Sequence, residues 1–378
     1  MNPFPPEQPQ LDLGRLERFG TGHLRIVTPT FFPEPIGTPH YALQLVQWVR
    51  SQGWTVDVVT ANPYYPRYEL YAGYDGRWRN DVVDDVPVRR LRTLVPKQGR
   101  MPWRAATEVN FLAQAVTARV SGRIRPTPLT LVICPGTPLV VPAARALTTA
   151  QGRVLCWVHD LQGGLARALG TPPAVCRAID ATERRLIASA DEILTLSQGM
   201  ADRLGARGVR APIAVLPLWS TLPPDDRTPV VRRADVQYSG NLGRKQGCDQ
   251  LLDLAERLQA ARPGTSMLIR ADAVARRPYE AHVTSRGISN VVFEDLAPHA
   301  RLRQALREAT VYVAPQRQGV GDSVMPSKVV NALAAGCRVV AASEPGTELV
   351  HMAARTDLLT ITAPGDVSGM ATAVLRLL

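Results

Sequence analysis

Short β-branched runs alternate with longer segments of helical periodicity along most of the chain. The first β-branched run is 24–28, and after a loop rich in Pro and Gly the segment 41–53 carries apolar residues at helical spacing and stops at Gly53. A second strand is expected at 54–61. A strand, a helix and a strand in this order are typical of a βαβ unit, which requires a parallel sheet. The pattern therefore predicts an α/β fold.

The same alternation continues to the end of the chain. In the first half, further strands are expected at 87–94, 129–135, 153–160, 192–197 and 212–217, and helices at 105–120, 138–150, 174–189 and 198–208. In the second half, strands are expected at 235–240, 266–271, 291–295, 311–315 and 338–343, and helices at 247–261, 278–286, 299–309 and 326–335. Each half is predicted to be a Rossmann-like, doubly wound parallel-sheet domain.

Prolines and charges interrupt the alternation near the middle of the chain. We expect a disordered N-terminal extension at 1–22, an N-terminal domain at 23–218, a linker at 219–235 and a C-terminal domain at 236–378. Two such domains in tandem would face a cleft at the carboxyl ends of their strands, where ligands bind in these architectures.

Composition narrows the class of protein. The chain has 378 residues, of which 45% are apolar, with no apolar run long enough for a membrane span and no apolar core of a secretory signal at its start. Its five cysteines are scattered, without a C-x-x-C pair, and its six histidines show no metal-ligand spacing. We therefore expect no disulfide framework, no metal site and a cytoplasmic location.

The net charge of +11 suits phosphate-bearing partners. The arginines are dispersed, and neither aromatic platforms among basic residues nor a nucleic-acid module is recognisable, so a nucleic-acid partner is not expected. Lysine occurs only at positions 97, 245 and 328, and the other 41 of the 44 cationic residues are arginine. A lysine retained in such a chain hints that a compact ammonium is needed.

Two stretches of the N-terminal half carry candidate chemistry. In "PEPIGTPHY", residues 33–41, Gly37 would let the backbone approach a ligand, and the amides of the following helix would face an anion. The alternative is an ordinary turn, and the absence of G-x-G-x-x-G disfavours a dinucleotide dehydrogenase. His159 and Asp160 follow a buried strand at its carboxyl end, where catalytic groups lie in such sheets. A purely structural histidine is the alternative there.

Two stretches of the C-terminal half would bind phosphate. In "YSGNLGRKQG", residues 238–247, a glycine turn presents Arg244 and Lys245 before a helix, which is the arrangement of a phosphate cradle. In 318–343, a flexible loop leads into a helix on which Lys328 and Asn331 share a face. A solvated turn and a plain βαβ unit with an exposed lysine are the respective alternatives.

Together these stretches resemble one enzyme family. The segments "FFPEPIGTPHYALQLVQWVRSQGWTVDVVTANPYYP", "WVHDLQ", "YSGNLGRKQGCDQLL" and "VMPSKVVNALAAGCRVVAAS" resemble retaining glycosyltransferases of the GT-B fold, family 4. Within that family the chain is similar to bacterial colanic-acid and O-antigen biosynthesis enzymes of the WcaI and WbuB type. The resemblance spans nearly the whole chain, and "NPYYP", "SGNLGRKQG" and "VMPSK" are its most specific parts.

The resemblance implies a sugar nucleotide, GDP- or UDP-linked, bound mainly by the C-terminal domain, and an acceptor hydroxyl at the N-terminal domain. No metal or other cofactor is implied. Cationic side chains would stabilise the departing diphosphate, and the leaving phosphate would itself take the acceptor's proton. The residues implied in catalysis are His159, Asp160, Arg244, Lys245 and Lys328. Those implied in donor binding are Gly37, Thr38, Gly240, Asn241, Gly243, Asp322, Ser323, Ser327 and Asn331.

The sequence departs from the broad family at several points. The family's E-x7-E pair falls at Ser323 and Asn331, with Asp322 one position away, and the family's arginine after the first glycine aligns with Asn241. The chain ends at "TAVLRLL", where the family's last helix would be beginning or absent. An inactive GT-B homologue acting as a partner subunit and a GT-B sugar-nucleotide epimerase are therefore alternatives.

The acceptor is left open as a sugar, a lipid-linked or a small-molecule hydroxyl. A polyprenyl-linked acceptor would favour peripheral association with the inner face of the membrane. Residues 97–104, "KQGRMPWR", place cations beside Met101 and Trp103 and are a candidate docking segment. A mobile acceptor loop in solution is the alternative interpretation of that segment.

Overall fold

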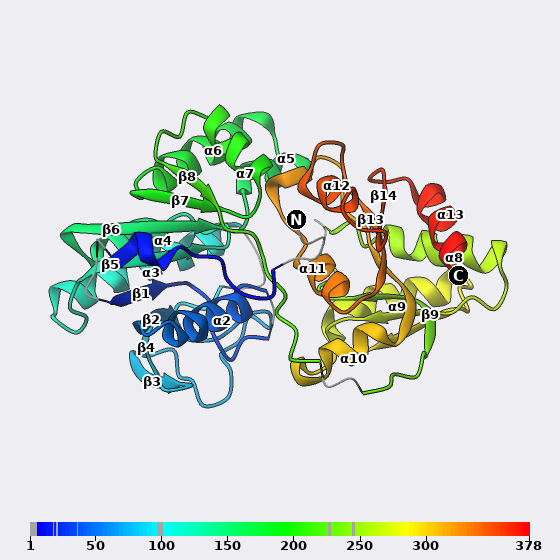
Figure 1. Ribbon diagram of the computed structural model, residues 1–378, viewed down its shortest axis with the longest axis horizontal. Coiled ribbons are helices and arrows are strands. Elements are labelled where there is room, and N and C mark those ends of the chain that lie inside the picture. The colour runs from blue at the N-terminus through cyan, green and yellow to red at the C-terminus, as the bar shows by residue number, and fades with distance from the viewer. Residues whose placement is uncertain are drawn as a thin grey trace. The chain divides into compact units, whose positions relative to one another are not determined.

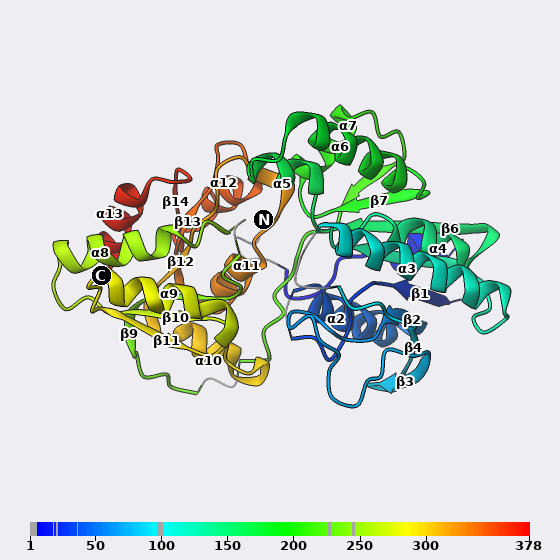
Figure 2. The ribbon, with the colours of Figure 1, turned by 180° about the vertical axis from the view of Figure 1, so that it is seen from behind.

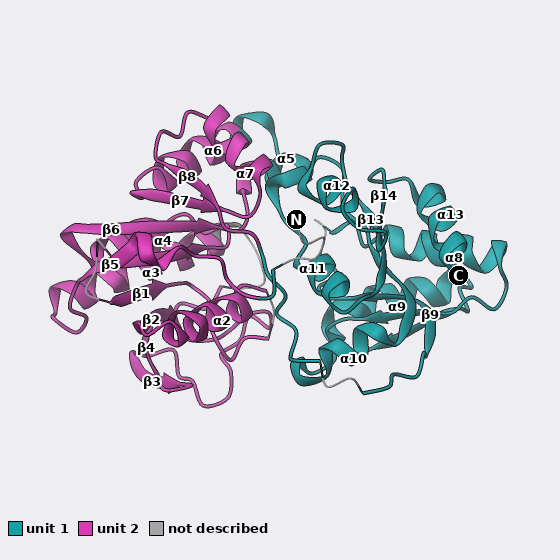
Figure 3. Ribbon diagram, viewed as in Figure 1, with its two compact units in different colours: residues 1–7, 164–176, 218–378 teal, residues 8–163, 177–217 magenta. Residues whose placement is uncertain are grey.

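The structure is a computed structural model that describes residues 6–17, 19, 22–35, 37–96, 101–225, 228–243 and 246–378 (Figures 1 and 2). It divides into two compact units (Figure 3). The N-terminal unit comprises residues 8–163 and 177–217. The C-terminal unit comprises 164–176 and 218–378, together with the described residues before 8. No helix of the described residues is long and apolar enough to cross a membrane.

The N-terminal unit is built on an eight-stranded sheet of order β3-β4-β2-β1-β5-β6-β7-β8. Its strands are β1 (His23–Val27), β2 (Thr55–Ala61), β3 (Arg79–Val83), β4 (Val86–Leu91), β5 (Thr127–Cys134), β6 (Thr148–Val158), β7 (Glu192–Thr195) and β8 (Ile213–Val215). Every adjacent pair is parallel except β3 and β4. The central strands are buried along almost their whole length, as a parallel sheet covered on both faces requires.

The helices of this unit are α1 (Leu13–Glu17), α2 (Thr38–Ser51), α3 (Met101–Val120), α4 (Val140–Ala146), α6 (Pro173–Ile187), most of which belongs here, and α7 (Gln198–Ala206). The chain winds outward from β1 through β2 to β4, and then in the other direction from β5 to β8. Because parallel crossovers are right-handed, this reversal puts α2 on one face of the sheet and α3 and α4 on the other (Figures 1 and 2). It also makes a topological switch point between β1 and β5, where ligands bind in open α/β sheets.

The C-terminal unit has a six-stranded, wholly parallel sheet of order β11-β10-β9-β12-β13-β14. Its strands are β9 (Ala234–Ser239), β10 (Met267–Arg270), β11 (Val291–Glu294), β12 (Ala309–Ala314), β13 (Arg338–Ala342) and β14 (Leu359–Thr362). Here the switch point lies between β9 and β12. The turn after β9 and the loop after β12 therefore flank it, and these carry the two phosphate-binding stretches expected from the sequence.

Two hydrophobic clusters cover the two faces of this second sheet. Val311 and Val313 of β12 point into one cluster, with α8 (Gln250–Ala261) and α13 (Val367–Leu377). Tyr312 and Ala314 point into the other cluster, with α11 (Ser327–Ala334) and α12 (Glu348–Ala353). The helices and helical turns of the unit are α5 (Gln162–Ala168), most of which belongs here, α8 (Gln250–Ala261), α9 (Ala273–Ser285), η2 (His299–Arg301), α10 (Leu302–Arg307), η3 (Gly321–Ser323), α11 (Ser327–Ala334), α12 (Glu348–Ala353) and α13 (Val367–Leu377).

The expected disordered extension at 1–22 contains a folded element. Residues 13–17 form α1, and Leu11, Leu13 and Leu16 are buried. An ion pair of 2.6 Å between Arg15 and Glu192 joins this segment to the N-terminal sheet. Burial of these leucines stabilises the segment in spite of the Pro-rich composition around it.

The expected linker at 219–235 also packs against the C-terminal unit. Trp219, Thr221 and Leu222 are buried, and the Thr221 amide donates to the Asn331 side chain over 2.9 Å. Residues 164–176, expected in the N-terminal domain, belong to the C-terminal unit as well. Gly164 lies so close to Ser323 that a Cβ on it would come within 2.1 Å of the Ser323 hydroxyl oxygen.

Several elements differ from their predicted bounds. Residues 148–150, expected in a helix, open β6, because the paired threonines favour a strand. The unexpected strand β3 pairs with β4 through Asp84 and Asp85, both in the left-handed conformation of a tight hairpin turn. Helix α9 starts at Ala273, capped by the Asp272 side chain, so that Pro278 lies inside it rather than at its start. The pattern also missed α5, α12 and β14.

Candidate functional site

The switch point of the N-terminal sheet brings together the first pair of expected site stretches. Gly37, with φ of 68°, precedes α2, and Thr38 is the first residue of that helix. His159 follows β6, where its amide bonds to the Cys134 carbonyl at the end of β5. The Thr38 hydroxyl lies 3.4 Å from Nδ1 of His159. Residues far apart in the sequence therefore meet at the carboxyl edge of the sheet.

His159 is a buried, neutral imidazole. It is 7% exposed, and burial lowers its pKa to about 4, although the neighbouring Asp160 carboxylate acts in the opposite direction. Its ring packs edge-to-face on Trp157, with centroids 4.2 Å apart. Nε2 is buried and has no hydrogen-bond partner among the described residues. An unsatisfied polar atom at this edge is well suited to bind a hydroxyl group of a ligand.

Glu34, whose role was not predicted from the sequence, organises the loop that precedes Gly37. Its carboxylate is 2% exposed and accepts hydrogen bonds from three backbone amides: Phe31 (3.2 Å), Tyr64 (3.0 Å) and Tyr65 (2.8 Å). Burial raises its pKa to about 7, while these bonds and Arg90 act to lower it. Glu34 thus ties the loop after β1 to the loop after β2. Its position between two prolines of "PEP" was the available signal.

In the C-terminal unit, Lys328 lies beside the glycine turn that follows β9. Its Nζ donates to the Tyr238 hydroxyl over 2.6 Å and lies 4.3 Å from the centroid of that ring. The Tyr238 hydroxyl in turn donates to the Asn241 carbonyl over 2.6 Å. Gly240 has φ of 142°, and a Cβ on it would lie only 3.5 Å from the Lys328 Nζ. The two predicted phosphate-binding stretches therefore meet here.

Arg244 and Lys245 lie outside the described residues. The residues on either side of them are positioned by close packing. A Cβ on Gly243 would come within 2.4 Å of the Gln246 side-chain oxygen, and one on Gly247 would come within 3.2 Å of the backbone between Gln316 and Arg317. The turn is thereby fitted against the loop that follows β12.

That loop carries Asp322 and Ser323, both buried. The Asp322 carboxylate accepts the Glu348 amide over 3.0 Å at the start of α12, so it ties two neighbouring loops together. The Ser323 hydroxyl is fully buried and has no partner among the described residues. A second link, which sequence analysis missed, joins the Glu344 carboxylate to the Gly319 amide over 2.5 Å.

Ser327 and Asn331 lie on α11 with Lys328, but Asn331 is already engaged. Its Oδ1 accepts from the Thr221 amide over 2.9 Å, and its Nδ2 donates to the Thr221 hydroxyl over 3.0 Å. A ribose contact by Asn331 would require the amide to change partners. Ser327 is the first residue of the helix and half-buried.

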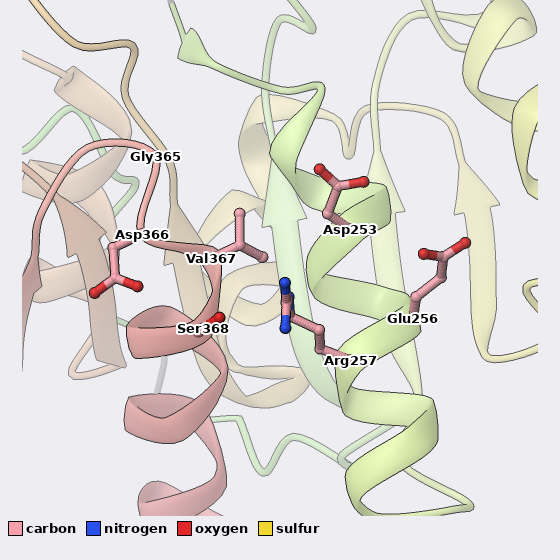
Figure 4. Close-up of a pocket in the computed structure, with 7 residues that line it drawn as sticks. All are labelled: Asp253, Glu256, Arg257, Gly365, Asp366, Val367 and Ser368. Carbon is pink, nitrogen blue, oxygen red and sulfur yellow. The ribbon is translucent and has the colours of Figure 1, made fainter.

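A pocket of about 400 Å³ lies elsewhere in this unit, between α8 and the start of α13 (Figure 4). It is lined by Asp253, Glu256, Arg257 and residues 365–368, including Asp366. Three carboxylates outnumber one guanidinium there, and Asp253 and Glu256 already pair with Arg286. The pocket is therefore poorly suited to an anionic ligand.

Comparisons with known proteins agree with this geometry. Residues 37–219 match the family described as glycosyl transferase 4-like domain, and residues 233–378 match glycosyl transferases group 1. The chain is 28% identical to a provisionally assigned colanic acid biosynthesis glycosyl transferase, WcaI, of Escherichia coli (strain K12), covering 84% of this chain and 83% of that protein.

Two solved structures show the same fold. Sucrose-phosphate synthase from Thermosynechococcus elongatus has a TM-score of 0.70 at 17% identity, covering 94% of this chain and 89% of that one. An α,α-trehalose-phosphate synthase (UDP-forming) from Burkholderia vietnamiensis has a TM-score of 0.66 at 14% identity, with the same coverage. The chain is thus a glycosyltransferase of the GT-B fold, with an N-terminal glycosyl transferase 4-like domain and a C-terminal domain of glycosyl transferases group 1.

Proposed function

We propose that this glycosyltransferase moves a sugar from a nucleoside-diphosphate sugar to a hydroxyl acceptor, with retention of anomeric configuration. The observation that carries the proposal is the position of Lys328 beside the Gly240 turn. A half-buried ammonium held next to a glycine turn at a topological switch point provides a site for a diphosphate. Arg244 and Lys245 follow this turn directly in the sequence and would add positive charge.

In the proposed reaction, the bond from the anomeric carbon to the diphosphate oxygen breaks, and a bond to the acceptor oxygen forms on the same face. The acceptor's proton passes to the leaving phosphate. Lys328 stabilises the negative charge that develops on the diphosphate, which is electrostatic catalysis without a change in the enzyme's own protonation. No protein residue is required as a general base in this scheme.

The proposed role of His159 is to bind a hydroxyl group of the transferred sugar. Its imidazole is neutral at physiological pH, and its buried Nε2 has no partner among the described residues. Thr38 holds the ring from the other side through Nδ1. A neutral imidazole so placed orients a sugar hydroxyl without competing for the charge of the diphosphate.

The likeness to a colanic acid biosynthesis enzyme supports a place in polysaccharide or glycolipid assembly. The donor that we propose is GDP- or UDP-linked, as the resemblance in the sequence implies. A lipid-linked acceptor would bring the enzyme to the inner face of the membrane. Residues 97–100 of the candidate docking segment lie outside the described residues. Sedimentation with anionic liposomes at low and high salt tests this association, and absence of binding at both salts removes it.

Thermal-shift screening against UDP, GDP, dTDP and their sugars tests the donor, because a bound ligand raises the melting temperature by mass action. We expect one base to dominate, and that nucleotide's sugar to be hydrolysed or transferred. The anomeric configuration of the product, read by NMR, tests retention. Absence of stabilisation by every nucleotide would refute the proposal.

An inactive homologue acting as a partner subunit is the second candidate. The Asn331 amide engaged by Thr221 and the absence of glutamate at positions 323 and 331 favour it. Nucleotide binding without transfer or hydrolysis of any donor would identify this case. Isomerisation of the donor in the absence of an acceptor would instead indicate an epimerase.

A further inference from the structure

The loop between β2 and β3, residues 62–78, is unusually rich in tyrosine. It holds five of the chain's nine tyrosines, at positions 64, 65, 68, 71 and 74. It contains no helix or strand. Long connections without regular structure inside a compact domain are uncommon, and many of them bind ligands. We call residues 62–78 the tyrosine loop.

The tyrosine loop is internally ordered by backbone hydrogen bonds. The Tyr68 amide bonds to the Tyr64 carbonyl over 2.8 Å, and the Tyr71 amide bonds to the Pro63 carbonyl over 3.1 Å. Tyr68 adopts φ of 58°, which is rare for a bulky residue. Such a conformation persists only where the surroundings hold it, and it is found most often at functional sites.

The tyrosine rings of the loop pack against one another and against the Arg67 guanidinium. Tyr65 and Tyr68 pack edge-to-face, with centroids 5.9 Å apart at 82°. The Arg67 guanidinium lies 5.6 Å from the centroid of the Tyr71 ring, and the Tyr71 hydroxyl donates to the Tyr65 carbonyl over 2.9 Å. Tyr65, Tyr68 and Tyr71 are all half-buried, so part of each side chain remains accessible.

The tyrosine loop adjoins the carboxyl edge of the N-terminal sheet, where His159 lies. Through the Tyr64 and Tyr65 amides, Glu34 ties it to the loop that leads to Thr38 and its contact with His159. Burial raises the pKa of Tyr65, and Tyr68 and the Asp160 carboxylate raise it further, whereas Arg104 acts to lower it. The Tyr65 phenol thus lies within electrostatic range of Asp160, next to His159.

We propose that the tyrosine loop binds a saccharide acceptor, whose sugar ring packs its C–H face against Tyr68 and Tyr65. The face of an aromatic ring carries partial negative charge and attracts the positively polarised C–H groups of a sugar. The neighbouring phenol and backbone groups supply hydrogen bonds to its hydroxyls. This inference rests on the proposed function, because it names the chemical class of the acceptor in that reaction.

The chemistry of the loop favours a saccharide over a lipid or a nucleic acid. Its half-buried tyrosines alternate with exposed Arg67, Glu69 and Asp75. A surface that docks on an anionic bilayer or on a nucleic acid would be predominantly cationic beside its aromatic rings, whereas this loop exposes two carboxylates, Glu69 and Asp75, and two guanidiniums, Arg67 and Arg77. Mixed charge around amphipathic rings suits a neutral, polyhydroxylated ligand.

Saturation-transfer NMR on the full chain tests the proposal without requiring turnover. The probes are methyl glycosides of glucose, galactose, fucose and N-acetylglucosamine, with geranyl phosphate as the lipid probe. Tyr68→Ala removes the ring, and Tyr68→Phe keeps it. Tyr279→Ala is the matched control, because it removes a half-buried tyrosine ring from α9 in the other unit.

We expect transfer to the C–H protons of at least one glycoside in the wild type. Tyr68→Ala should weaken binding about fivefold to tenfold, whereas Tyr68→Phe and Tyr279→Ala should bind as the wild type does. Once an acceptor is found by turnover, Tyr68→Ala should raise its KM by the same factor and leave the donor KM unchanged.

Three results would overturn the inference: no glycoside contacts the wild type, Tyr68→Ala binds as well as the wild type, or geranyl phosphate alone binds. Nucleotide binding, measured in parallel by thermal shift, separates this inference from the proposed function. A chain that binds nucleotides but loses no glycoside affinity in Tyr68→Ala keeps its proposed function and loses the tyrosine-loop acceptor site.

Discussion

The ammonium of Lys328 lies 2.6 Å from the hydroxyl of Tyr238 and 4.3 Å from the centroid of the same ring. Tyr238 is itself buried, and burial raises the pKa of its phenol well above the usual value, so it stays protonated. Its hydroxyl donates to the Asn241 carbonyl while it accepts from Lys328. The buried ring therefore fixes the cation beside the glycine turn before any ligand arrives.

Lys328→Ala should lower turnover by about a hundredfold to a thousandfold, the usual effect of removing one donor to a developing anion. Stability should change little, because Lys328 is only half-buried. Lys328→Arg should restore activity only in part, since a guanidinium stacks on an aromatic ring as a planar fork and does not reproduce the compact ammonium beside the glycine turn. Steady-state kinetics and melting curves measure the two effects. Unchanged turnover in Lys328→Ala and in Lys245→Ala would remove the proposed diphosphate site.

Asn331→Ala should lower the free energy of unfolding. The substitution leaves the buried Thr221 amide without its acceptor, which costs about 1–3 kcal/mol. Urea denaturation measures that loss, and the exposed Ser289→Ala serves as a control for removal of a polar side chain. If the variant instead keeps its stability and loses nucleotide affinity, Asn331 binds the donor directly and the Thr221 bond is incidental.

His159 should make stability fall in acid. The pKa of His159 is about 4 in the folded chain, whereas the ordinary value of 6.5 applies in the unfolded chain. Between these two pH values, the unfolded chain therefore binds one more proton than the folded chain does. Stability from this group is complete above pH 6.5, and about 3 kcal/mol is lost as the pH falls to 4. As the pH falls from 6.5 to 4, the melting temperature of the wild type should therefore fall relative to that of His159→Asn. His282→Asn, which removes an exposed imidazole from the other unit, is the matched control.

The same low pKa predicts the pH profile of activity. The imidazole stays neutral above about pH 4, so His159 should contribute no inflection to kcat between pH 5 and 8. An inflection near pH 6.5 that disappears in His159→Asn would contradict a neutral, hydroxyl-binding histidine.

Glu34 should make the folded chain less stable as the pH rises, which is the opposite of the effect of His159. Its folded pKa of about 7 lies above the ordinary 4.5, so as the pH rises between these values the unfolded chain releases its proton first. About 3 kcal/mol of stability is lost from pH 4.5 to 7, and Glu34→Gln lacks this loss. Melting curves of the variant against wild type should thus converge or cross as the pH rises. Glu69→Gln, which removes an exposed carboxyl group from the same unit, is the matched control.

Strand and helix periodicity was sufficient to predict two α/β domains, because buried parallel strands are short, nearly continuous runs of apolar and β-branched residues. Periodicity failed where exposed or polar residues form a strand, a turn or a helix cap. Strand β3 was missed because its residues are largely exposed, and Asp84 and Asp85, which make its turn, resemble loop residues. Pro278 was taken as a helix start, although the cap at Asp272 sets the true one.

Within the candidate site, the short motifs singled out particular loops but did not indicate which contacts hold those loops. Lys328 and Gly240 were predicted from lysine usage and glycine spacing, and the structure brings them together. The roles of Glu34 and Tyr238 were not predicted, because both bond across loops distant in sequence. Such partners are set by tertiary packing, which local periodicity does not report.

The chain passes between the two units at four places: 7/8, 163/164, 176/177 and 217/218. A change in the orientation of the units must therefore be absorbed at four backbone positions together, rather than at a single flexible joint. For the same reason neither unit is a contiguous fragment. Cutting the chain at 217/218 would strip residues 164–176 from the C-terminal unit and uncover Ser323, which Gly164 packs against. Exchange of domains with another enzyme would have to carry all of these segments.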